Sequence, residues 1–348
     1  MPDALIERVR AAYESGTPLV IQGSGSKAFY GNAGGGEILD TRGVDGIVDY
    51  QPKELVLTAR AGTTLAKIEA LLDAHDQMLA FEPPRFGGAG TLGGSLAAGL
   101  SGPRRPYAGA VRDFVLGLRL IDGSGQPLRF GGQVIKNVAG YDVSRLMVGA
   151  LGTLGVVTEV SLKVLPRPAS ELTLQFELDE AGALRTMNQW AGQPLPLSAS
   201  SWHAGLLTLR LSGATAAVRA AHAKLGGEAL EDATAFWQRL RDHATPFFDK
   251  RPLWRLATKP TAAPLGLDAP QWIEWGGALR WLAADLPAAA LRRAAQAAGG
   301  HATLFRGDAP LDGVFTPLAP ALATLHARLK QRFDPRGILN RGRLYPDF

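Results

Sequence analysis

Glycine is concentrated in the first half of this chain, where it gathers in loops that follow short apolar stretches. Of the 42 glycines, 27 precede residue 156, and clusters lie over 23–27, 86–95 and 140–155. Glycine lets backbone N–H groups reach a ligand with no side chain in between, and it tolerates left-handed φ angles. Three such loops favour one long anionic ligand that the backbone contacts along its length.

The rest of the chain differs in composition, which indicates two domains. All seven tryptophans follow residue 189, and the prolines of the Pro-Arg-Pro sequence at 166–168 interrupt both helices and sheet pairing. Strand and helix patterns recur in both halves, so we expect the α+β class. The predicted domains are 1–168 and 169–330, followed by a C-terminal segment, 331–348, that returns to the first domain.

The chain contains no cysteine, which excludes disulfides, thiolate zinc sites, cysteine-ligated iron–sulfur clusters and a catalytic cysteine. Its net charge of +5 is mild for 348 residues, and no nucleic-acid-binding module is recognisable, so we expect no nucleic-acid partner. No apolar stretch approaches the ~18 residues of a membrane span. The N-terminus lacks the apolar segment of a signal peptide, so we expect a cytoplasmic protein.

The first glycine loop, residues 23–28, fits the dinucleotide-binding pattern G-x-G-x-x-A. A Rossmann site also needs a helix that begins in this loop and points its N-terminus at the pyrophosphate. The next residues, 29–36, include four glycines and cannot form a stable helix. A Rossmann fold is therefore not predicted. An anion-binding loop and an ordinary turn between strands both stay open.

Five motifs, in order and in spacing, carry a resemblance to a known family. They are Gln22–Ser26, Arg60–Leu65, Thr91–Gly94, Lys136–Asp142 and Gly152–Thr158. Together they resemble the FAD-binding domain of the vanillyl-alcohol oxidase and p-cresol methylhydroxylase (PCMH-type) flavoproteins. Two later segments, 272–281 and 333–345, indicate which member of this superfamily the chain resembles. With them, essentially the whole chain resembles the E subunit of bacterial glycolate oxidase, the smaller FAD-binding subunit.

This resemblance implies a PCMH-type FAD-binding domain of two α+β subdomains over 1–168, followed by an α+β cap domain over 169–330 that covers the flavin or contacts other subunits. Backbone N–H groups of the first glycine loop would bind the FAD pyrophosphate, and later loops would line the rest of the FAD path. The cofactor-binding residues implied in this way are Gln22, Gly23, Ser24, Gly25, Ser26, Lys27, Thr91, Gly93, Gly94, Ser101, Arg105, Gly109 and Val157.

The resemblance also implies an FAD-dependent oxidoreductase acting on CH–OH donors, which oxidises a 2-hydroxy acid such as glycolate to glyoxylate. It implies a complex with a larger FAD-binding subunit and an iron–sulfur subunit, with electrons passing to a partner and the complex associating with the inner face of the membrane. Two alternatives stay open. One is an FAD-bearing structural subunit without catalytic activity; the other is an autonomous flavin oxidoreductase that acts on another alcohol.

Oxidation of a 2-hydroxy acid needs a base for the hydroxyl proton and a cation for the carboxylate. The candidates for these roles are His203, His301, Arg280 and Arg343. Each has a plainer alternative as a surface histidine or a salt-bridged arginine, so no catalytic residue is assigned. No two histidines have metal-ligand spacing on one element, and we expect no metal.

Two motifs of the catalytic relatives are absent at the matching places. Ala150 and Leu151 stand where the relatives carry a serine–glutamate pair, and the cap has no His-x-Gly-Asp-Gly-Asn-x-x-His run. We therefore expect little glycolate oxidation by the isolated chain. We also expect non-covalent FAD, because cysteine is absent and the only histidine before residue 203, His75, lies on a helical stretch away from the glycine loops.

Overall fold

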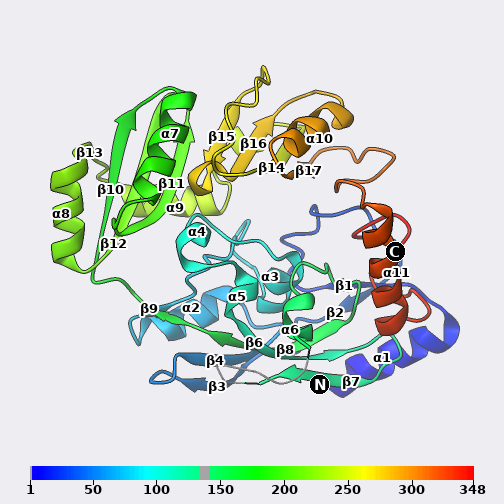
Figure 1. Cartoon of the computed structure of the whole chain (residues 1–348). Coiled ribbons are helices and arrows are strands. Elements are labelled where there is room, and N and C mark those ends of the chain that lie inside the picture. The colour runs from blue at the N-terminus through cyan, green and yellow to red at the C-terminus, as the bar shows by residue number, and fades with distance from the viewer. Residues whose placement is uncertain (1, 133–140) are drawn as a thin grey trace. The chain divides into compact units, whose positions relative to one another are not determined.

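The computed structural model describes residues 2–132 and 141–348, which form two compact units (Figure 1). Unit 1 contains the residues up to 101, 110–166 and 317–348. Unit 2 contains residues 102–109 and 167–316. Both units combine helices with antiparallel sheets, which confirms the predicted α+β class.

In unit 1, a parallel pair joins β1 (Leu19–Gln22) to β2 (Glu37–Asp40), and an antiparallel pair joins β5 (Gln77–Met78) to β9 (Leu165–Pro166). A five-stranded antiparallel sheet has the order β3 (Ile47–Gln51), β4 (Val56–Arg60), β8 (Val156–Lys163), β6 (Val115–Ile121), β7 (Pro127–Gly131). The helices are α1 (Pro2–Ser15), α2 (Leu65–Asp73), α3 (Leu92–Ala98), α5 (Val111–Phe114), α6 (Val143–Leu146) and α11 (Pro320–Phe333). Helices α3 and α6 pack on the five-stranded sheet (Figure 1).

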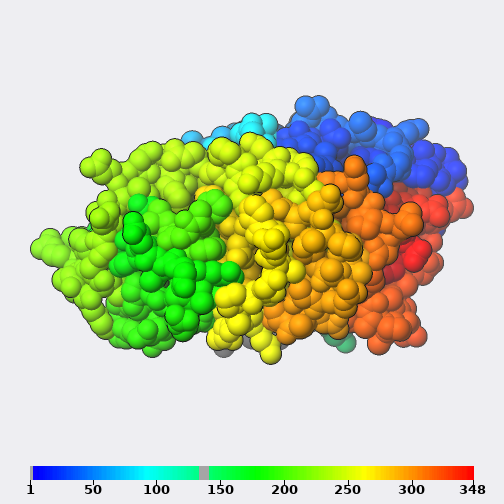
Figure 2. All heavy atoms as spheres, turned by 90° about the horizontal axis from the view of Figure 1, so that it is seen from above, coloured from blue at the N-terminus to red at the C-terminus, as the bar shows by residue number. Residues whose placement is uncertain are grey.

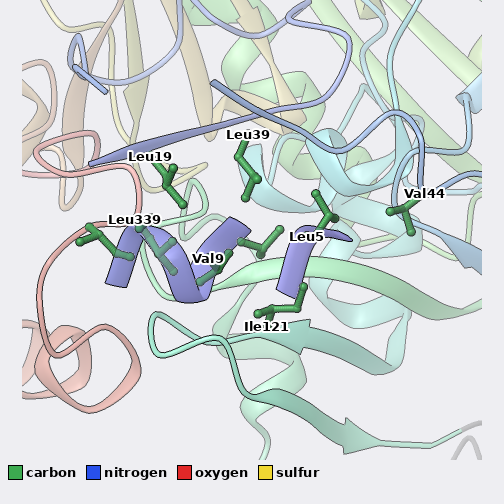
Figure 3. Packing of buried hydrophobic residues seen from close by; sticks show 10 residues of the cluster. Leu5, Val9, Leu19, Leu39, Val44, Ile121 and Leu339 are labelled. Atoms are coloured by element: carbon green, nitrogen blue, oxygen red, sulfur yellow. The ribbon is translucent and has the colours of Figure 1, made fainter. Parts of the chain in front are cut away.

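The two ends of the chain share one hydrophobic core beside β1 and β2. Leu5 and Val9 of α1 lie in a buried cluster with Leu19 of β1 and Leu39 of β2 (Figure 3). Leu339, from the C-terminal segment, belongs to the same cluster and forms a parallel bridge with Leu19. The C-terminal segment therefore completes the core that supports β1.

Unit 2 is built on an eight-stranded antiparallel sheet. Its order is β13 (Glu228–Ala229), β10 (Ser170–Glu177), β12 (Leu206–Gly213), β11 (Leu197–His203), β15 (Gln271–Glu274), β16 (Leu279–Ala283), β14 (Leu253–Ala257), β17 (His301–Arg306). Early strands of the unit occupy one side of the sheet and late strands the other, as the change from green to orange across Figure 2 shows. The helices are α4 (Arg105–Ala108), α7 (Glu180–Ala191), α8 (Thr215–Leu225), α9 (Ala233–Arg241) and α10 (Ala288–Ala297), with short 3₁₀ turns η1 (Pro246–Asp249) and η2 (Trp275–Gly277).

The units differ from the expected domains at three segments, the shortest being residues 167–168, which we assigned to the first domain and which belong to unit 2. Residues 317–330, which we assigned to the second domain, belong to unit 1, where the helix they enter packs Phe333 against Phe130 of β7. Residues 102–109, assigned to the first domain, belong to unit 2. There the indole N–H of Trp275 donates to the carbonyl of Gly102 over 3.1 Å, which anchors the segment.

An aromatic cluster surrounds His243, directly after α9 in unit 2. The imidazole stacks on Phe248, with ring centroids 4.1 Å apart, and lies 4.6 Å from the Trp281 ring. Burial, together with the Arg306 and Arg255 guanidinium groups, holds the pKa of His243 well below its usual value. The folded protein therefore keeps this imidazole neutral, because an imidazolium here would lose hydration and face two cations.

This neutral histidine predicts a loss of stability in mild acid. As the pH falls through about 6.5, the unfolded chain takes up a proton at His243 and the folded chain does not, so the free energy of unfolding decreases. The contribution of this group is at most about 1.4 kcal/mol per pH unit. Urea unfolding of wild type and His243→Phe between pH 7 and pH 5 measures how the free energy of unfolding changes with pH. The variant should lose the part of this pH dependence that comes from His243. His222→Ala, on α8, is the control and should keep it; equal slopes in wild type and His243→Phe would contradict the prediction.

Candidate functional site

A hollow of about 1020 Å³, which includes space open to solvent, lies within unit 1. Three stretches of chain line it, within 20–28, 91–98 and 147–157, and Thr41, Asn340 and Arg343 complete the lining. All three glycine clusters found in the sequence border the hollow.

The loop that follows β1 presents free backbone donors to this hollow. Among the residues that the structure describes, the N–H groups of Gly23, Ser24 and Gly25 donate to no acceptor. Gly25 has a φ of +75°, a conformation that residues other than glycine rarely adopt. Successive free N–H groups in such a turn form a concave anion-binding surface. Of the two interpretations of this loop, the geometry favours the anion-binding loop.

The second glycine cluster shapes the wall of the hollow. The Thr91 side chain caps α3 by accepting the N–H of Gly94, and the N–H of Gly93 donates to the Ala61 carbonyl over 2.8 Å. A Cβ atom on Gly93 would lie 2.8 Å from the Ala61 Cβ, and one on Gly23 would lie 2.5 Å from Thr91 Oγ1. Gly23 and Gly93 are therefore required for close packing. The N–H groups of Gly93 and Gly94 are already bonded within the chain, so these residues shape the wall and do not add free donors to it.

The lining combines positive charge with apolar surface. Lys27 and Arg343 are its charged residues, and no carboxylate lines the hollow among the described residues. The apolar side chains come mostly from α3 and the stretch before and into β8: Ala97, Ala98, Met147, Ala150, Leu151, Leu154 and Val157. Free N–H groups, two cations and an apolar wall suit a ligand that joins phosphate to a large planar ring.

The C-terminal segment closes one side of the hollow through Asn340. Its Oδ1 accepts the N–H of Ile21 over 2.7 Å, and its Nδ2 donates to the carbonyl of Leu151 over 2.6 Å. A Cβ atom on Gly152 would lie 2.7 Å from Asn340 Nδ2, so glycine is needed beside it. Sequence reasoning missed this role: Asn340 lay inside a family motif, but nothing local marked its side chain as a link between two loops of the pocket.

A buried lysine fixes the segment that carries Asn340. The Lys330 Nζ atom donates to Asp334 Oδ2 over 2.6 Å and to the carbonyls of Thr153 and Leu339, each over 2.8 Å. The Asp334 carboxylate in turn accepts the N–H groups of Ile338 and Leu339. Burial lowers the pKa of Lys330, and the Asp334 charge opposes that shift. Sequence reasoning missed this pair as well, because Lys330 looks like any basic residue on a helix.

Ten of the thirteen predicted cofactor-binding residues line the hollow: Gln22, Gly23, Ser24, Gly25, Ser26, Lys27, Thr91, Gly93, Gly94 and Val157. The other three lie elsewhere. The Ser101 hydroxyl accepts the N–H of Val111, and Arg105 and Gly109 belong to unit 2, where the Arg105 guanidinium lies 4.3 Å from the centre of the Trp275 ring. Of the motif Lys136–Asp142, residues 136–140 lie outside the described residues.

The four catalytic candidates do not come together in one site. Arg280 is fully buried and donates to the carbonyls of Gly277, Ala262 and Ala263. His203 stacks on Trp272 at 4.3 Å, with its Nδ1 2.8 Å from the Gln271 carbonyl. His301 is exposed at the start of β17.

Arg343 alone of these four lines the hollow. Its guanidinium donates to the carbonyls of Asn32, Lys27 and Ala28. These bonds connect the C-terminal segment to the first glycine loop. Arg343 therefore helps to shape the pocket, and its charge lies beside the free N–H groups of that loop. No group of three or more His, Cys, Asp or Glu side chains that could hold a metal occurs in the described part of the chain.

Comparison with known proteins assigns the chain to a family. A family described as "FAD binding domain" matches residues 2–131. The "Glycolate oxidase subunit GlcE" of Escherichia coli (strain K12) is 50% identical over 345 residues, which are 99% of this chain and 97% of that protein. The chain belongs to the GlcE family of glycolate oxidase subunits. It is an FAD-dependent oxidoreductase with FAD as its cofactor, which confirms the family, the activity class and the cofactor predicted from the sequence.

More distant relatives share part of this chain or only its fold. The "Glycolate oxidase subunit GlcD" of Bacillus subtilis (strain 168) is 34% identical over 187 residues, covering 50% of this chain and 39% of that protein. A solved structure of alkyldihydroxyacetonephosphate synthase covers 97% of this chain and 75% of its own, with a TM-score of 0.66 and 15% identity. This structure shows the fold alone, and it confirms the predicted PCMH-type architecture. Each helix in the described part of the chain is too short or too polar to cross a membrane.

The first glycine loop predicts a specific effect of mutation on FAD binding. Gly25→Val places a β-branched residue at a φ of +75°, which the loop tolerates only by moving its N–H groups. We expect FAD affinity to fall at least about tenfold, the equivalent of ~1.4 kcal/mol. Titration of the apoprotein with FAD, followed by flavin fluorescence, measures this. Gly35→Val is the control, because a Cβ atom on Gly35 would meet no other atom within 4 Å; equal affinity of both variants and wild type would contradict the assignment.

Proposed function

We propose that this chain carries FAD within a glycolate oxidase complex that oxidises glycolate or a related 2-hydroxy acid, and that electrons pass from it to a partner subunit. The pocket of unit 1 carries the proposal: Gly23, Ser24 and Gly25, whose N–H groups have no acceptor, line the same hollow as the apolar residues of α3 and of the stretch 147–157. The full-length likeness to an E. coli glycolate oxidase subunit supports the choice of reaction.

The chain's own residues divide the work of holding the cofactor. The N–H groups of the 23–25 turn would bind the pyrophosphate, and the Lys27 ammonium would balance its charge. The apolar wall, with Leu154 and Val157, would contact the ring system and keep water from it. Bound FAD supplies a two-electron acceptor for hydride from the alcohol carbon. Ser101, Arg105 and Gly109 remain proposed contacts from the family resemblance, although they do not line this pocket.

The places of Arg280, His203 and Arg343 in the structure support a second function. The carbonyl partners of Arg280 and the stacking of His203 on Trp272 tie both residues to the chain itself. Arg343 is bonded to three carbonyls, so a substrate carboxylate would have to compete with them. These placements favour an FAD-bearing subunit that completes the complex while substrate is oxidised on another subunit.

The proposed partners are a larger FAD-binding subunit related to GlcD and an iron–sulfur subunit. This chain has no cysteine with which to ligate a cluster, so transfer through iron–sulfur centres would require the partner. The proposal places the complex in the cytoplasm, where it would contact the inner face of the membrane through its other subunits. An autonomous oxidoreductase acting on another alcohol is the outcome that the next experiment tests.

Glycolate oxidation should depend on assembly. The isolated holoprotein, mixed anaerobically with glycolate or D-lactate, should keep its flavin absorbance, because none of the four candidate residues is placed as a free base beside the pocket. Glycolate should bleach the flavin absorbance of the complex reconstituted with both partner subunits. Rapid bleaching and turnover by the isolated chain with an artificial electron acceptor would favour the autonomous enzyme.

We also propose that FAD is bound non-covalently, since the lining of the pocket contains no histidine, tyrosine or cysteine among the described residues. Acid precipitation of the holoprotein should leave all the yellow colour in the supernatant and the polypeptide at its unmodified mass. Colour that stays with the precipitated chain would show a covalent link.

A further inference from the structure

Helix α11 presents leucines to solvent and buries a lysine. Leu322 and Leu325 are 51% and 52% exposed, and Leu329 is half-buried. At positions i, i+3 and i+7 these three residues form one line along the helix, here called the leucine stripe. Of the 14 residues of α11, only Lys330 is buried. Apart from Phe333, which packs against Phe130 at its end, the helix buries little of the apolar surface that normally stabilises a helix of this length.

The packed side of α11 borders the leucine stripe along the line of His326 and Lys330. His326 contacts the rings of Tyr345 and Phe348, and Lys330 donates to the carbonyls of Thr153 and Leu339. Isolated helices shorter than about 12–15 residues are marginal in water, and most helices in proteins are stabilised by burying an apolar face. The leucine stripe is therefore a surface that further packing would stabilise.

The charges beside the stripe define what can cover it. Helix α11 contains His326, Arg328, Lys330 and Arg332 but no acidic residue. Arg328 and Arg332 are exposed and follow Leu325 and Leu329 by three residues, so they lie along the same side. Neither forms an ion pair with the described residues. Two copies of this helix would repel one another, whereas a surface with carboxylates would be attracted.

We propose that the leucine stripe docks a partner subunit of the oxidase, in an apolar groove edged by Asp or Glu side chains. This rests on the proposed function as part of a complex. Leucines would enter the groove as helix-in-groove anchors, and Arg328 and Arg332 would pair with the acidic edge. An anionic membrane is the weaker alternative, because an interfacial helix buries a broad apolar face and the exposed leucines here are two.

The test uses the full-length holoprotein and the double variant Leu322→Glu/Leu325→Glu. Tagged wild-type and variant chains are each mixed with the larger flavin subunit and the iron–sulfur subunit from the same source, and complex formation is measured by size exclusion with light scattering. We expect the double variant to weaken assembly at least about tenfold, and Arg328→Glu/Arg332→Glu to weaken it with a reduced salt dependence. Leu311→Glu is the control, because Leu311 is fully exposed outside α11, and it should assemble normally.

Each other outcome overturns the proposal. Normal assembly of the double variant would show that the stripe is not the interface. A fall in the melting temperature of the isolated variant would show that the stripe packs within this chain, and a change in its own oligomeric state would identify a second copy as the occupant. Stripe-dependent binding to phosphatidylglycerol vesicles, with assembly intact, would identify a membrane. If the wild-type chain fails to assemble, the proposed function fails, and the docking proposal fails with it.

Discussion

The buried ammonium of Lys330 connects the parts of the chain on which the FAD pocket depends. It holds the Thr153 carbonyl of one pocket wall, the Leu339 carbonyl of the C-terminal segment, and Asp334, whose carboxylate fixes the turn between them. Removing one member of a buried, hydrogen-bonded pair typically costs about 3–5 kcal/mol, because the other is left uncompensated. This network, together with the backbone bonds between Leu19 and the residues Ile338 and Asn340, places Asn340 between β1 and the 150–155 loop.

The pocket therefore combines two kinds of structure. Local sequence shapes the donors: β1 is followed by Gly-Ser-Gly, whose N–H groups have no acceptor, and Gly25 permits the turn. Contacts between distant residues form the enclosure, since Asn340 reaches Ile21 across 319 positions in sequence. Unit 2 adds a sheet in which the side chains of Arg280 and Trp272 bond to groups of the same unit.

Sequence patterns predicted the features that neighbouring residues determine, and they missed the contacts between residues far apart in the sequence. The glycine loop at 23–27, the α+β class and the family were predictable because motifs and spacing carry them. Asn340 and Lys330 were not, because nothing beside them in sequence distinguishes a buried clamp from a surface residue. Arg280 looked suitable for a carboxylate, but the fold buries its guanidinium against backbone carbonyls. The segment 102–109 was assigned to the first domain, yet Trp275, far along the chain, anchors it in unit 2.

The dependence of the FAD pocket on the C-terminal segment can be measured with the variant Asn340→Asp. The carboxylate can still accept the Ile21 N–H, but it cannot donate to the Leu151 carbonyl, which it would face at about the same distance. An unsatisfied buried polar group destabilises the folded state by about 1–3 kcal/mol. Because this loss detaches the C-terminal segment from the 150–155 loop, FAD must order that wall when it binds, and we expect its dissociation constant to rise at least about fivefold. Fluorescence titration of the apoprotein measures it, with the exposed Arg341→Ala as the control. If Asn340→Asp binds FAD as tightly as wild type, the C-terminal segment does not complete the pocket.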